Sequence, residues 1–197
     1  MDDAFALLVA CGRAAIARAR GVPPEPDDAI ALLASGIADA GRMLEAAEAH
    51  GIVPLVCREV LARPGLLTAE ARHSLAGAQQ AAAVRALDAF RELRDVLRHL
   101  EAADIHALPY KGPVLAFDAY GDVTMRDSAD LDIVVAAPDI DRAAAVLGAH
   151  GYRPADGRAW RDARATNEWQ AQVTLRRDGG RLPLDVHWRF CDRKLPW

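Results

Sequence analysis

The chain has 197 residues and a formal net charge of -4, and alanine contributes much of its 52% apolar fraction. The sequence pI of about 5.9 gives no overall basic field, so non-specific nucleic-acid binding is disfavoured. The three cysteines are widely spaced and form no CxxC pair, so neither a disulfide framework nor a zinc site is indicated, and a reducing cytoplasm fits.

A membrane segment is not expected. No apolar run approaches the roughly 20 residues that a membrane-spanning helix needs. The N-terminus carries Asp2 and Asp3, where a signal peptide would be basic. We therefore expect a cytoplasmic protein.

The first half of the sequence predicts helices. Apolar residues recur there at three- and four-residue intervals, which places them on one face of each helix. The expected helices cover residues 3–20, 27–35, 38–50, 52–62 and 68–103, with Asp27 as a cap, Gly36 as an interruption and the last range as one long helix or two abutting ones. We expect a helical region over residues 1–96.

The pattern changes after Asp104 to one of short strands and helices. Alternation and apolar runs predict strands over residues 105–110, 131–136, 170–176 and 182–188 and helices over residues 114–119 and 139–150. Gly179 and Gly180 lie between the last two strands and indicate a hairpin. The sequence therefore predicts an α+β (mixed α/β) fold, with an α/β core over residues 97–197.

Arginine is frequent in the last 50 residues, from Arg153 to Arg181. Asp156, Asp162 and Asp178 interleave with these arginines, which favours a solvated surface of mixed charge. A basic groove for a phosphorylated substrate is the alternative.

Two acids stand where the strand over residues 131–136 begins. Side chains alternate between the faces of a strand, so Asp130 and Asp132 point the same way while Leu131 and Ile133 point into the core. Two carboxylates on one face repel each other unless a cation lies between them. Magnesium takes few carboxylates together with phosphates and waters, which suits this pair; the alternative is that both acids face solvent.

Three residues near the acids suit phosphate. Gly112 follows a short strand and precedes a helix, so its backbone can approach a phosphate closely, and Lys111 adds a cation. Arg126 lies four residues before Asp130 and carries a fork that fits phosphate oxygens. The alternatives are an exposed surface lysine and a salt bridge from Arg126 to a neighbouring aspartate.

Asp185 lies between apolar residues on the last predicted strand. A strand next to the first acidic strand would bring Asp185 to the same metal, and Asp185 could accept the proton of an attacking hydroxyl. His187 projects on the same face, where it would position the substrate or Asp185, or form an ordinary hydrogen bond at the rim of the core.

From Leu97 to Trp188 the sequence resembles the DNA polymerase beta-like nucleotidyltransferase superfamily, and within it the bacterial group described as uncharacterised nucleotidyltransferases. The resemblance rests on an ordered set of residues rather than on any one motif. The set is Lys111, Gly112, Tyr120, Arg126, Asp130, Asp132, Gly151, Tyr152, Asp185, His187 and Trp188. The wider superfamily has Gly-Ser, at a shorter distance before the acids, where this sequence has Lys-Gly.

The resemblance implies a small polymerase-beta-like sheet flanked by helices and a metal-dependent enzyme. It would transfer a nucleoside monophosphate from a nucleoside triphosphate such as ATP to an unidentified acceptor, a small molecule or a protein, with release of pyrophosphate. Mg2+ or Mn2+ would be held by Asp130, Asp132 and Asp185, one ion at all three acids and a second at the first two.

The alternative function is a non-catalytic nucleotide-binding or partner-binding module of a biosynthetic or toxin–antitoxin system. The Ala-rich helical half favours it only weakly. The sequence ends soon after Asp185, where relatives often continue into further helices, which suggests a fragment or a shortened version.

Overall fold

The computed structural model describes residues 3–22, 28–35, 40–63 and 65–189. The chain divides into two compact units, each with its own core. The first unit comprises residues 1–87 and 115–127, and the second comprises residues 88–114 and 128–197.

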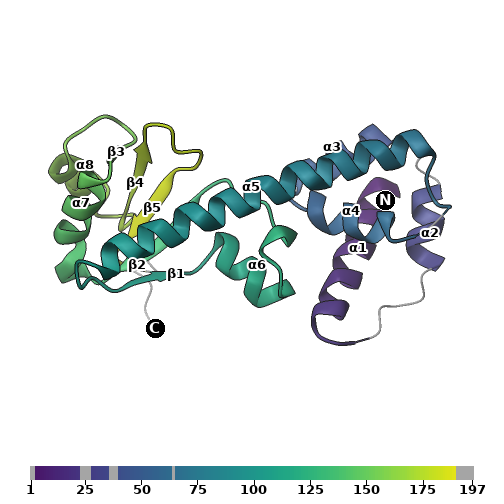
Figure 1. Ribbon diagram of the computed structural model, residues 1–197, viewed down its shortest axis with the longest axis horizontal. Coiled ribbons are helices and arrows are strands. Elements are labelled where there is room, and N and C mark those ends of the chain that lie inside the picture. The colour runs from purple at the N-terminus through teal and green to yellow at the C-terminus, as the bar shows by residue number, and fades with distance from the viewer. Residues whose placement is uncertain (1–2, 23–27, 36–39, 64, 190–197) are drawn as a thin grey trace. The chain divides into compact units, whose positions relative to one another are not determined.

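The first unit is helical (Figure 1). Its helices are α1 (Asp3–Ala19), α2 (Asp28–Ser35), α3 (Ala40–Ala49), α4 (Val53–Leu61) and the first part of α5 (Ala69–Glu101). Leu7 of α1, Met43 of α3 and Val56 of α4 are at most 1% exposed, so the apolar faces predicted from the periodicity form one core. The predicted helices are confirmed, whereas the Asp27 cap and the interruption at Gly36 lie outside the described residues.

The second unit is built around a five-stranded sheet. The strands are β1 (Ala107–Pro109), β2 (Leu131–Val135), β3 (Tyr152–Pro154), β4 (Gln172–Arg177) and β5 (Leu184–His187), in the spatial order β1-β2-β5-β4-β3. Only the β2–β5 pair is parallel. The remaining helices in the described part of the chain are α6 (Gly112–Tyr120), α7 (Ile140–Ala149), α8 (Trp160–Thr166) and the short 3-10 turns η1 (Val123–Met125) and η2 (Ala137–Asp139).

The two faces of the sheet differ in character. Leu131 and Ile133 of β2 and Leu184 and Val186 of β5 are fully buried against apolar side chains of α5, α7 and α8. Because side chains alternate along a strand, the opposite face carries Asp132, Asp185 and the other polar residues of these strands. In β2 and β5 these four apolar residues thus lie in the core, and Asp132 and Asp185 lie on the other face.

The α+β fold class and the β4–β5 hairpin are confirmed. Two elements, β3 and α8, were not predicted, because three residues are too few to alternate visibly and α8 carries Arg161, Asp162 and Arg164 in only seven residues. The expected boundary between residues 96 and 97 falls inside α5 and stays a prediction. Among the described helices none is long and apolar enough to cross a membrane.

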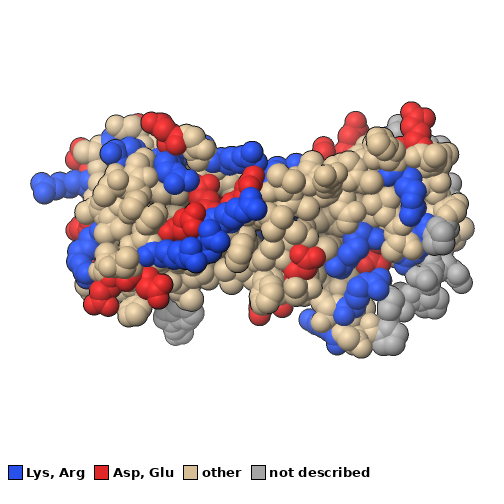
Figure 2. Space-filling model, viewed as in Figure 1, with Lys and Arg blue, Asp and Glu red and all other residues tan. Residues whose placement is uncertain are grey.

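Basic and acidic side chains are interspersed over the face drawn in Figure 2. Several arginines of the last 50 residues are ion-paired, Arg158 with Asp156 at 2.5 Å and Arg164 with Asp141 at 2.5 Å. Arg181 likewise pairs with an aspartate of α5. These pairs favour the mixed-charge surface over a basic groove.

Candidate metal-binding and catalytic site

The strand register places the site residues in a row across the polar face of the sheet. Asp132 of β2 is the direct neighbour of Asp185 of β5, and Thr174 of β4 is the direct neighbour of Asp185 on the other side. Tyr110 and Lys111 follow the end of β1 beside the same row. Neighbouring strands lie about 4.8 Å apart, so side chains on one row can share a ligand.

Asp132 is the buried centre of this row, because its side chain has no exposed surface. Its Oδ1 atom accepts a hydrogen bond from the Lys111 ammonium at 2.8 Å and one from the Tyr110 hydroxyl at 3.4 Å. The Nε2 atom of His187 lies 3.2 Å from the same oxygen and 3.1 Å from the Tyr110 hydroxyl. One carboxylate oxygen thus carries all of the contacts that Asp132 makes with these three residues.

The other oxygen of Asp132, Oδ2, is buried and accepts no hydrogen bond from any residue that the structure describes. A buried carboxylate oxygen without a donor costs free energy, and such atoms are rare unless an ion or water satisfies them. Asp132, Asp185 and His187 each offer one ligand atom, and these atoms lie within 4.8 Å of one another. Two carboxylates, one of them with an unsatisfied oxygen, and one imidazole fit a divalent cation.

Asp185 is oriented from the neighbouring strand. Its Oδ1 atom accepts a hydrogen bond from the Thr174 hydroxyl at 2.5 Å, and its Oδ2 atom accepts one from the Gln172 side-chain amide at 3.3 Å. Each carboxylate oxygen has about two lone-pair positions, so one position on each oxygen remains for a metal or a proton. These two contacts hold Asp185 without saturating it.

Lys111 neutralises charge beside the acids. Its hydrogen bond to Asp132 is the main reason that the pKa of Lys111 is raised above the usual value of 10.5. The pKa of Tyr110 is also raised, chiefly by burial and then by the nearby Asp132 carboxylate. The chain has 24 basic residues and only two of them are lysines, so a lysine here is a compositional exception.

Gly112 follows Lys111 and begins α6 with φ at +55°, a conformation that favours glycine. A Cβ atom added at Gly112 would lie 3.4 Å from the Ser128 hydroxyl and 3.6 Å from the carbonyl oxygen of Asp130. The backbone therefore passes close to the segment that leads into β2, and the close approach to a phosphate expected from the sequence stays a prediction.

Two of the three predicted metal ligands belong to one group of possible ligand atoms. The metal-ligand group found among the described residues contains Asp132 and Asp185 but not Asp130, which precedes β2 and is half-buried. Arg126 belongs to the first unit. The roles expected for Asp130 in metal binding and for Arg126 in nucleotide binding stay predictions.

The sequence interpretation assigned no contact to Tyr110, Gln172 or Thr174, although all three lie at the site. His187, which was expected to position the substrate, is also part of the ligand group. Alternation along β4 puts Gln172 and Thr174 on the face opposite to the core residue Val173, and pairing with β5 places them beside Asp185. The strand register, which the sequence does not encode directly, was the missing information.

The fold and the ligand group define a mixed α+β protein with an acidic site on its sheet that could hold a metal. Residues 37–196 match the family described as "Uncharacterised nucleotidyltransferase", and this span is most of the chain, so the chain belongs to that family. No curated protein and no solved structure matches the chain.

Proposed function

We propose that the chain transfers a nucleoside monophosphate from a nucleoside triphosphate to an acceptor hydroxyl and releases pyrophosphate. The observation that carries the proposal is the buried, unsatisfied Oδ2 atom of Asp132 beside Asp185 and His187 in a member of a nucleotidyltransferase family. Lys111 balances one of the two neighbouring negative charges through Oδ1 of Asp132, and a divalent cation at Oδ2 would balance the pair.

Asp132 and Asp185 are the proposed metal ligands, with His187 as a third candidate. Oxygen ligands suit Mg2+ or Mn2+. A divalent ion bound there would neutralise the carboxylates and the developing charge on the phosphates. Asp130 is proposed to join when the triphosphate is bound.

Lys111 and the backbone amide of Gly112 are proposed to hold the triphosphate. Lys111 is 46% exposed, so its ammonium can contact a phosphate at the surface as well as Asp132. Gly112 begins α6, and amides in the first turn of a helix favour anions, which supports this role for its amide.

Asp185 is the proposed base. In the reaction the acceptor oxygen forms a bond to the α-phosphorus, and the bond from that phosphorus to the bridging oxygen of the β-phosphate breaks. Pyrophosphate leaves with the electron pair, and the acceptor's proton passes to Asp185. Thr174 and Gln172 keep the carboxylate of Asp185 oriented for this transfer.

Mn2+ binding, followed by the loss of the free-ion signal in electron paramagnetic resonance, tests the proposal without the acceptor. Asp132→Asn and Asp185→Asn are each expected to weaken Mn2+ binding at least about tenfold. Asp178→Asn makes the same change in the exposed turn between β4 and β5 and should bind Mn2+ as the parent does. Equal affinity in all four proteins would contradict the proposal.

A further inference from the structure

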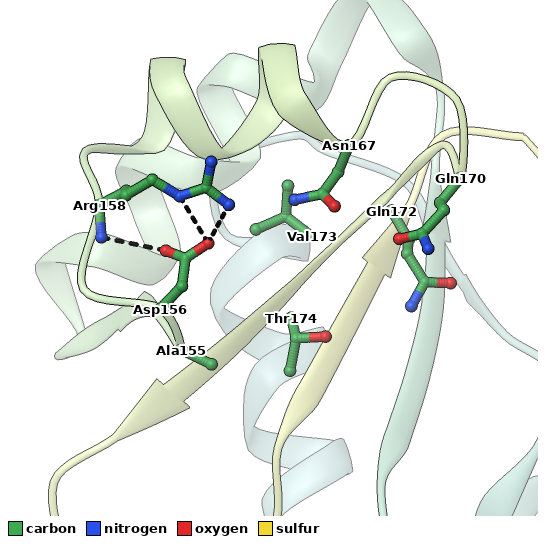
Figure 3. Close-up of a pocket in the computed structure, with 8 residues that line it drawn as sticks. All are labelled: Ala155, Asp156, Arg158, Asn167, Gln170, Gln172, Val173 and Thr174. Carbon is green, nitrogen blue, oxygen red and sulfur yellow. Dashed lines mark hydrogen bonds and ion pairs between the residues drawn. The ribbon is translucent and has the colours of Figure 1, made fainter.

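A pocket of about 230 Å³ lies beside β4 (Figure 3), and two of its lining residues, Gln172 and Thr174, also contact Asp185. It is bordered by Gln172 and Thr174 of β4, by Asn167 and Gln170 between α8 and β4, and by the segment that follows β3. Small-molecule sites commonly span roughly 300 to 1,000 Å³. The pocket therefore has room for one ring-sized group rather than for a large ligand.

The lining is unusually rich in carboxamides. The whole chain contains one asparagine and four glutamines, and Asn167, Gln170 and Gln172 are three of these five residues. A carboxamide both donates and accepts hydrogen bonds, as the hydroxyl of Thr174 does. A ligand that fits these groups must also both donate and accept, which is the chemistry of a hydroxyl group.

Charge and shape exclude other ligand classes. Arg158 donates two hydrogen bonds to Asp156, at 2.8 and 2.5 Å, and one to Thr166 at 2.7 Å, so the one basic side chain of the lining is already engaged. Asp156 balances the charge of Arg158, so a phosphorylated or acidic ligand would meet no net positive charge there. The lining contains no aromatic side chain, so a nucleobase would find no stacking surface.

The pocket adjoins the proposed base. Thr174 and Gln172 line it and also hydrogen-bond both oxygens of Asp185. In the strand order, Lys111 at the end of β1 and the pocket at β4 lie on opposite sides of Asp132 and Asp185. A triphosphate at Lys111 and a second molecule in the pocket would thus meet at the carboxylates.

We infer that this pocket is the acceptor site and that the acceptor is a neutral polyhydroxylated molecule of monosaccharide size. The inference rests on the proposed function, because it takes Asp185 as the base. A ring hydroxyl beside Asp185 gives its proton to the carboxylate as its oxygen bonds to the α-phosphorus, and pyrophosphate departs. The product is a nucleoside monophosphate ester of the sugar.

Nuclear magnetic resonance of the 15N-labelled chain can test the inference through the side-chain amides. The probes are D-glucose, D-mannose and D-galactose, with adenosine as the nucleoside probe. At least one hexose is expected to shift the signals of Asn167, Gln170 and Gln172. Gln79 and Gln80 of α5 are internal controls and should not move.

Gln170→Ala separates a site from a general solvent effect. This exposed residue is expected to contribute one neutral hydrogen bond, so its loss should weaken hexose binding about two- to tenfold. Gln80→Ala is the matched control and should leave the affinity unchanged. Failure of all three hexoses, a shift caused by adenosine alone, or an unchanged affinity in Gln170→Ala would each overturn the inference.

The same labelled sample distinguishes this inference from the proposed function. Titration with Mg2+ and a non-hydrolysable triphosphate should shift the backbone signals of Lys111 and Asp132. A hexose response without that shift would contradict the proposed transfer reaction and leave the sugar site standing. The reverse result would retain the reaction and remove the sugar as acceptor.

Discussion

The contact between Lys111 and Asp132 determines how the site behaves without a metal. The ammonium lies 2.8 Å from Oδ1 of a carboxylate with no exposed surface, while Oδ2 is left without a donor. Lys111 and a divalent cation would therefore compete for binding to the Asp132 carboxylate. This competition makes the lysine informative about the metal as well as about the nucleotide.

Lys111→Met keeps much of the aliphatic stem and removes the charge. Metal-free protein should lose about 1 to 3 kcal/mol of unfolding free energy, because buried Asp132 loses its cationic partner. Mn2+ should bind more tightly and a non-hydrolysable triphosphate about ten- to a hundredfold more weakly, as expected when one charge-assisted phosphate contact is lost. Calorimetric titration measures both affinities, and Lys111→Arg is the control that preserves the charge. Weaker Mn2+ binding in Lys111→Met than in the parent would contradict the competition.

In α4, Glu59 is an acid whose side chain has no exposed surface and which lies among arginines. Arg18 approaches it at 3.0 Å and Arg63 at 3.4 Å, and burying a charge in this way is tolerated only when it is paired. Such a cluster links α1 to α4 within the helical unit but has no connection to the proposed chemistry.

Glu59→Gln is expected to lower the unfolding free energy by about 3 kcal/mol. This loss lies at the lower end of the range for breaking a buried ion pair, because Arg18 is 51% exposed and water can solvate it. Denaturant unfolding of the whole chain measures the effect, and Glu45→Gln on the exposed side of α3 is the control. Equal midpoints for the two variants would show that the cluster does not stabilise the unit.

The rings of His99 in α5 and His150, which follows α7, stack with centroids 3.4 Å apart. Burial, and then the neighbouring His150, lowers the pKa of His99 below 6.5. The unfolded chain therefore binds more protons in mild acid, so the stability from this pair is present above pH 6.5 and is lost as the pH falls toward the lower folded value.

His150→Gln should reduce this pH dependence. Between pH 7.5 and pH 5.5 the melting temperature of the parent should fall more than that of the variant, because the variant lacks the second imidazole. Thermal unfolding followed by circular dichroism at several pH values gives the comparison. Parallel curves would mean that the stacked pair does not couple protonation to folding.

At the scale of the whole molecule, the sequence predicted the helices, the β4–β5 hairpin and the strand that carries Asp132, because periodicity and glycine turns are local signals. It did not predict β3 or α8, which are too short to show a period. It also missed the contacts of Gln172 and Thr174 with Asp185. Those contacts depend on which strands are neighbours, and strand order is a property of the folded chain.

The expected convergence of Asp130 with Asp132 and Asp185 stays a prediction. Alternation places Asp130 and Asp132 on one face, but Asp130 precedes the first residue of β2, where the strand geometry that fixes a side-chain direction begins. Asp132 and Asp185 are paired by the parallel register of β2 and β5, which brings residues 53 positions apart in the sequence into direct contact. Local spacing was thus less informative than strand pairing.

A crystal structure of the chain with Mn2+ and a non-hydrolysable nucleoside triphosphate tests the central claim most directly. Anomalous scattering locates the ion independently of the protein atoms. We predict a peak coordinated by Oδ2 of Asp132 and by the Asp185 carboxylate, with the triphosphate bound on the Lys111 side. A structure with nucleotide and ion bound elsewhere, or with no ion at these carboxylates, would contradict the account.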